Sequence, residues 1–132
     1  MTAKNTYYRQ WLKKAEEDEL SAKALLKVGS PATVCFLSQQ TTEKLLKTLL
    51  VFYEKEFPKV HDLTVLAQLL KPVVPQIENF KEDFKSLGTY YVETRYPGDY
   101  PEFTWRDAAA ALKTMEKIKK FVLEKIDASR EN

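Results

Sequence analysis

The sequence predicts an all-α protein, built as an up-and-down bundle of four to five helices. Apolar residues recur at spacings of three, four or seven positions through most of the chain, which places them on one face of a helix. No alternating apolar and polar run of useful length indicates a strand. Short loops between long amphipathic segments favour antiparallel packing, and we expect a single domain over residues 1–132.

The first helix is expected from about Thr6 to Val28. The GSP run at positions 29–31 interrupts the helical pattern and marks its end. The predicted apolar stripe consists of Tyr7, Trp11, Ala15, Ala22, Leu25 and Val28.

Two residues of this helix depart from its pattern. Asp18 falls within the apolar stripe, where an ionised carboxylate is costly unless it is paired. We therefore expect a structural ion pair, with Arg95 and His61 as the candidate partners. Leu20 falls on the polar side, either as a tolerated exposed residue or as a contact in a dimer.

The second helix is expected from about Pro31 to Glu54, with proline in the first turn, where its missing N–H costs little. Gln40, Lys44 and Lys47 lie within about 60° of one another on the face expected to point outward, so they form a candidate contact surface. The predicted inner arc consists of Val34, Leu37, Ser38, Thr41, Leu45, Leu49 and Phe52.

Three further helical segments follow. The stretch VHDLTVLAQLL predicts a short helix capped by Asp62. A second segment is expected from Gln76 to about Tyr91. The last helix is expected from Trp105 to about Ile126, preceded by a capping box of Thr104 and Asp107.

Composition and charge exclude several classes of protein. The chain is 44% hydrophobic and 30% charged, which is typical of a folded domain. A net charge of +2 disfavours a basic protein that coats a nucleic-acid duplex. No apolar stretch resembles a signal peptide or approaches the roughly 18 residues of a membrane span. We expect a cytoplasmic protein with no membrane contact.

The sequence offers little chemistry for a cofactor or a nucleophile. The single cysteine, Cys35, and the single histidine, His61, lie 26 positions apart and form no metal-binding cluster. No glycine-rich phosphate loop is present. We expect no metal and no cofactor, and Cys35 is expected to pack as a small apolar side chain.

Four motifs, taken in order, resemble the HEPN family of small helical domains from bacteria and archaea, which are often paired with nucleotidyltransferases. They are WLKKAEEDELSA from position 11, FLSQQTTEKLLKTLL from position 36, HDL from position 61 and RYP from position 95. The resemblance spans roughly residues 11–122. It implies a four- or five-helix bundle that is commonly a homodimer.

Several HEPN proteins are metal-independent ribonucleases, with an Arg followed after four to six residues by a His near the dimer interface. After Arg95 the permitted positions hold Tyr100, Pro101 and Glu102. Imidazole moves protons near neutral pH, whereas a guanidinium remains protonated and can only hold a phosphate. The chain therefore looks like the RYP-type branch, for which the resemblance implies nucleotide binding or pairing with a minimal nucleotidyltransferase.

The favoured hypothesis is a non-catalytic binding module for a nucleotide or an RNA phosphate, or one that docks a nucleotidyltransferase in a toxin–antitoxin-like pair. Its expected ligand-binding residues are Arg95, Tyr96, His61, Gln40, Lys44 and Lys47. Three alternatives stay open: a ribonuclease using His61 and Arg95, an adaptor with no small ligand, and a structural role for these residues. In the last case Arg95 and Tyr96 close one end of the bundle and His61 caps the third helix.

Overall fold

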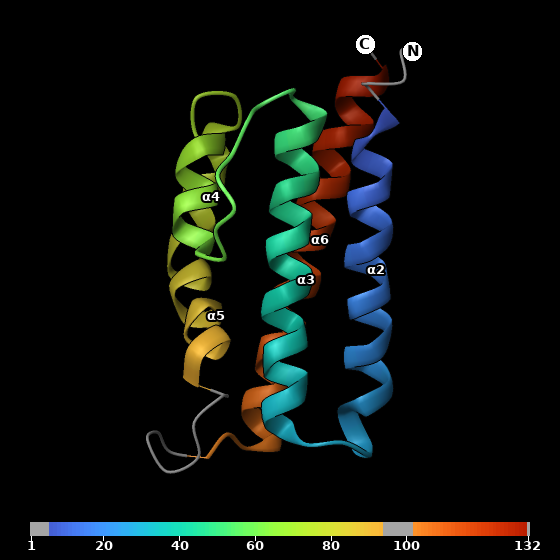
Figure 1. Cartoon of the computed structure of the whole chain (residues 1–132), viewed down its shortest axis with the longest axis vertical. Coiled ribbons are helices and arrows are strands. Elements are labelled where there is room, and N and C mark those ends of the chain that lie inside the picture. The colour runs from blue at the N-terminus through green and yellow to red at the C-terminus, as the bar shows by residue number, and fades with distance from the viewer. Residues whose placement is uncertain (1–5, 94–101, 132) are drawn as a thin grey trace.

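The computed structural model describes residues 6–93 and 102–131, and within these ranges all the regular secondary structure is helical, which confirms the predicted all-α bundle. In Figure 1 the long helix α3 stands in the middle, with α2 and α6 along one side and α4 and α5 along the other. The elements are α2 (Tyr8–Ala24), η1 (Leu25–Lys27), α3 (Pro31–Phe52), α4 (Leu63–Leu70), η2 (Pro75–Phe80), α5 (Lys81–Glu93) and α6 (Trp105–Glu131).

The central helix α3 begins where the sequence predicts. Pro31 occupies its first turn, and the hydroxyl of Ser30 accepts a hydrogen bond from the backbone N–H of Thr33 at 3.1 Å. Neighbouring helices surround α3, so its small hydroxyl residues are buried. Each of these hydroxyls donates to the carbonyl one turn earlier, which satisfies it without a partner from another helix. These residues are Ser38, Thr41, Thr42 and Thr48.

The apolar stripe predicted for α2 is wrong at both of its ends. Tyr8 is buried in place of Tyr7, and its ring meets Phe52 edge-on with centroids 5.0 Å apart. At the other end the chain tightens into the 3-10 turn η1, which rotates about 120° per residue in place of about 100°. The stripe therefore does not continue, and Val28 is 81% exposed. Leu20 is also exposed, as its position on the polar side predicted.

A partly buried ion cluster joins α2 to α6. The carboxylate of Glu19 lies 2.6 Å from Nζ of Lys119 and 3.0 Å from Nζ of Lys23. Burial raises the pKa of the Glu19 carboxyl, but the hydrogen bonds and charges of Lys119 and Lys23 together outweigh it, so the pKa lies below its usual value. The apolar pattern did not single out Glu19, although this residue and not Asp18 is the buried carboxylate of α2.

The helices α4, α5 and α6 lie where the sequence predicts, although α6 continues to Glu131, past its expected end near Ile126. Asp62 caps α4 by accepting from the N–H of Thr64 at 2.9 Å, as predicted. The segment expected from Gln76 begins as the 3-10 helix η2 and continues as α5. Thr104 and Asp107 form the predicted capping box, with reciprocal bonds of 2.8 and 3.1 Å. None of the described helices is long and apolar enough to cross a bilayer.

Candidate functional site

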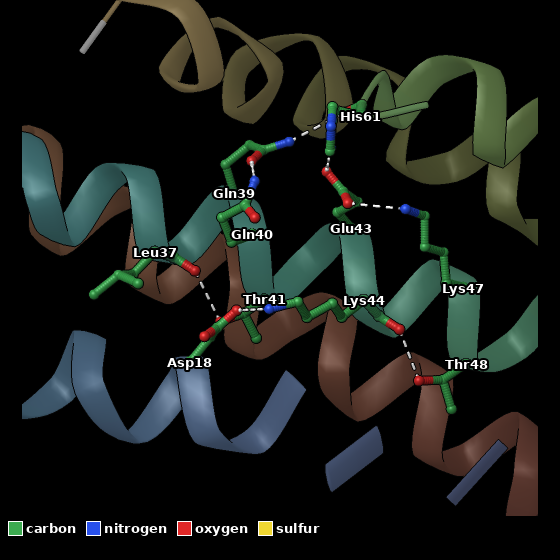
Figure 2. A network of polar contacts seen from close by, with 10 residues as sticks. All are labelled: Asp18, Leu37, Gln39, Gln40, Thr41, Glu43, Lys44, Lys47, Thr48 and His61. Atoms are coloured by element: carbon green, nitrogen blue, oxygen red, sulfur yellow. Dashed lines mark hydrogen bonds and ion pairs between the residues drawn. The ribbon is translucent and has the colours of Figure 1, made fainter. Parts of the chain in front are cut away.

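His61 lies in the loop before α4, and two side chains of α3 hold its imidazole and its backbone. Oε1 of Glu43 is 3.0 Å from Nδ1 of the ring, and Nε2 of Gln39 donates to the backbone carbonyl of His61 at 3.2 Å. Figure 2 shows both side chains rising from the same face of α3 toward His61. Because Gln39 and Glu43 are one helical turn apart, the central helix determines the position of the ring.

The carboxylate of Glu43 is shared between His61 and Lys47. Its second oxygen, Oε2, lies 3.0 Å from Nζ of Lys47, and the Glu43 and Lys47 side chains are only 4% and 8% exposed. The ammonium group also lies 5.5 Å from the ring centroid of Trp11 and 5.9 Å from that of Phe57. A buried carboxylate therefore faces an ammonium on one side and the imidazole on the other.

Aromatic rings extend the site from His61 to α5. The imidazole stacks on Tyr91, with centroids 4.5 Å apart and an interplanar angle of 19°. Tyr91 also stacks with Phe36 of α3, at 6.1 Å and 27°. The His61 side chain nevertheless remains 51% exposed, so it presents an oriented ring to solvent.

A cavity of about 430 Å³ opens beside this ring, within the range of about 300–1,000 Å³ that is usual for small-molecule sites. It carries one ammonium group, that of Lys85, whose nearest carboxylate is Glu82 at 3.7 Å on the exposed surface. Gly88 forms part of the cavity wall, and a Cβ added there would meet no atom within 4 Å, so the space beside it is open. The lining residues are His61, Asp62, Thr64, Phe84, Lys85, Gly88, Thr89 and Tyr91.

The predicted placement of Gln40, Lys44 and Lys47 on an outer face is wrong. Lys47 is buried, and the other two are partly buried. The physical reason is that α3 is the central helix, with α2, α4, α5 and α6 packed around it, so none of its long faces points to solvent. Gln40 donates to the side chain of Gln39 at 2.7 Å, and therefore supports the residue that holds the His61 backbone.

Asp18 does form an ion pair, but with a residue that the sequence did not suggest. Its carboxylate lies 2.5 Å from Nζ of Lys44, and both side chains are partly buried. Of the two partners expected from the sequence, His61 contacts Glu43 instead. Arg95 and Tyr96 lie outside the described residues.

The described residues offer no metal site. No three of their His, Cys, Asp and Glu side chains gather closely enough to hold an ion. Cys35 is fully buried, and burial raises its pKa to about 12, so it remains a protonated thiol at neutral pH. It packs as a small apolar residue, as expected.

Four residues of the site were not singled out by sequence reasoning. For Glu43 a signal existed, because Glu followed four residues later by Lys is a favourable helical pair. Gln39 precedes the predicted contact residue Gln40. Tyr91 and Lys85 belong to a predicted helix, but no local pattern in the sequence links them to His61.

Comparisons with known proteins identify the family of this chain. The sequence matches the family model described as "HEPN domain" over residues 8–126. It is 28% identical over 144 aligned residues to "Putative toxin MJ1304" of Methanocaldococcus jannaschii, covering 90% of each chain. Among solved structures, TT1696 from Thermus thermophilus superposes with a TM-score of 0.76 at 31% identity, covering 89% of this chain and 97% of that one. An archaeal HEPN homologue, ST0689, gives 0.72 at 30% identity, covering 90% and 97%.

Proposed function

The chain belongs to the HEPN family, and on this premise we propose that it is a HEPN-type module that binds a nucleotide or an RNA phosphate in the cavity beside His61. The observation that carries the proposal is the combination, in one open cavity, of an oriented and half-exposed imidazole with the ammonium group of Lys85. The ammonium supplies the charge that a phosphate requires. The stacked rings of His61 and Tyr91 supply the flat surface on which bases stack in single-stranded RNA sites.

Some residues named from the sequence are proposed to contact the ligand, and others support the residues that do. Arg95 and Tyr96 follow the last residue of α5, Glu93, by two and three positions, and we propose them as a second phosphate contact and a further ring. Gln40 and Lys47 support the binding residues through Gln39 and Glu43. Lys44, the residue after Glu43, pairs with Asp18 and so joins α2 to this turn of α3.

Titration of the purified protein with ATP and with a short single-stranded RNA tests this function. Lys85→Ala and Arg95→Ala should each raise the dissociation constant about tenfold, because each removes a charged hydrogen-bond donor. Lys120→Ala removes an exposed lysine of α6, which does not line the cavity, and should leave binding unchanged. Binding of neither ligand at millimolar concentration would reject the proposal.

We also propose that the module acts as a homodimer and pairs with a nucleotidyltransferase in a toxin–antitoxin-like system. The relative named as a toxin supports the toxin–antitoxin-like pairing, and the HEPN resemblance of the sequence implies the homodimer and the nucleotidyltransferase. Light scattering on the purified chain should give twice the mass of 15.3 kDa. Co-purification with a nucleotidyltransferase encoded beside its gene tests the pairing, and a chain that remains alone and monomeric would refute both statements.

A second candidate function is metal-independent cleavage of RNA by His61 together with Arg95. The contact between Glu43 and His61 favours it, because a carboxylate that orients an imidazole is the arrangement found beside general bases. Incubation of RNA with the protein in the presence of a chelator tests it. Cleavage should occur in the parent protein and disappear in His61→Ala while the helical signal in circular dichroism is retained.

A further inference from the structure

The two ring nitrogens of His61 have different chemical roles because of Glu43. A carboxylate can only accept hydrogen bonds, so the Nδ1 atom that faces it must carry the proton. Lys47 lies against the other oxygen of the same carboxylate and compensates its negative charge. In the neutral ring Nε2 then carries a lone pair, and this atom points away from the buried carboxylate.

A lone pair on Nε2 selects the group that can bind there. None of the described residues forms a hydrogen bond with Nε2. Phosphate oxygens are acceptors and cannot donate to this atom at neutral pH, whereas a ribose hydroxyl can. The cavity thus separates two tasks, since Lys85 provides a charge for phosphate and His61 provides an acceptor for a hydroxyl.

Asp62 and Thr89 also bring oxygen acceptors to the cavity, and each takes part in hydrogen bonds within its own segment. Oδ1 of Asp62 already accepts from both the N–H and the hydroxyl of Thr64, at 2.9 and 2.6 Å, as the cap of α4. The hydroxyl of Thr89 donates to the carbonyl of Ser86 at 2.8 Å, within its own helix. Both groups are placed by bonds within their own segments, whereas the ring of His61 is oriented by its contact with the central helix α3.

We infer that the His61 cavity distinguishes ribose from deoxyribose, with Nε2 of His61 accepting a hydrogen bond from the 2′-hydroxyl of a ribonucleotide. The inference rests on the proposed function and narrows its ligand to RNA or a ribonucleotide. Glu43 is the positioning residue, because it fixes which nitrogen carries the proton. The 2′-hydroxyl is the group by which proteins tell the two sugars apart.

A matched pair of five-nucleotide single strands, identical in bases and differing only in the sugar, tests the inference. The parent protein should bind the ribose strand about three- to tenfold more tightly, which corresponds to one hydrogen bond. His61→Phe keeps a ring that can stack on Tyr91 but removes Nε2, so it should lower the affinity for the ribose strand to that for the deoxyribose strand. The affinity for the deoxyribose strand should hardly change.

The outcomes separate the two proposals. Equal affinity of the parent protein for both strands would overturn the inference while leaving the proposed function in place, whereas binding of neither strand would reject both.

A second measurement, by NMR, does not depend on a variant. Because His61 is the only histidine, its two ring ¹⁵N signals can be assigned without ambiguity. When the ring is neutral they should report protonated Nδ1 and unprotonated Nε2, and the opposite tautomer would refute the inference.

Discussion

Oε1 of Glu43 lies 3.0 Å from Nδ1 of His61, so the central helix fixes a ring carried by the loop that precedes α4. The same carboxylate holds the buried ammonium group of Lys47. Removing Glu43 should therefore affect stability as well as the site.

Glu43→Leu should lower the free energy of unfolding by about 3 kcal/mol, because it leaves the Lys47 ammonium buried without its counter-ion. The double variant Glu43→Leu with Lys47→Met should recover most of this loss, since an apolar pair of similar size avoids the buried charge. Urea unfolding measures both values. Glu82→Ala, which removes an exposed carboxylate, is the control and should have almost no effect. A double variant as unstable as the single one would contradict this account of the pair.

Acid should weaken the junction between α2 and α6. The folded-state pKa of Glu19 lies below its ordinary value of 4.5, so its contribution to stability is present above that pH and is lost as the pH falls through the folded-state pKa. Thermal melting between pH 6 and pH 3 should show a smaller fall in melting temperature for Glu19→Gln than for the parent protein. Parallel curves for the two proteins would show that Glu19 contributes nothing to acid sensitivity.

Substitutions at Gly88 separate stability from binding. Gly88→Ala should raise the free energy of unfolding by about 0.5–1 kcal/mol, because alanine favours the helical backbone and the added Cβ meets no neighbour. Gly88→Leu should project into the cavity and weaken nucleotide binding more than tenfold while the chain remains folded. Ser86→Leu on the same helix lies outside the cavity lining and is the matched control. Unchanged binding by Gly88→Leu would exclude this cavity as the ligand site.

Cys35 should be unreactive in the folded protein. Its pKa of about 12 leaves roughly one thiol in ten thousand ionised at pH 8, and the thiolate is the reactive form. A colourimetric thiol reagent should therefore react with it only after the protein is unfolded in guanidinium chloride. Rapid reaction in native buffer would mean that this part of α3 opens readily.

Features set by local chemistry could be predicted from the sequence. The Asp62 cap and the Thr104–Asp107 box depend on residues two or three positions apart, and both are present. The prediction of the apolar stripe of α2 was wrong where η1 changes the rotation per residue, because apolar spacing alone does not reveal a switch to a 3-10 turn. The outward placement of Lys47 failed because its surroundings depend on which helices pack around α3.

The candidate site could be predicted only in part. His61 stood out as the single histidine, but its contact with Glu43 spans 18 positions and its contact with Tyr91 joins the loop to α5. Such contacts arise from the packing of separate elements, so the spacing of residue types does not indicate them. The partners of Asp18 and His61 were therefore visible only once the helices had been placed.

Glu43 and Lys44 are neighbours in the sequence, yet one contacts His61 and the other contacts Asp18 on α2. Adjacent residues of a helix differ in direction by about 100°, and this difference allows one turn of α3 to serve both contacts. Inserting or deleting a single residue just before Glu43 would rotate the two side chains together and break both attachments. Length changes in natural variants of this chain should therefore be absent from that stretch of α3 and confined to the connections between helices.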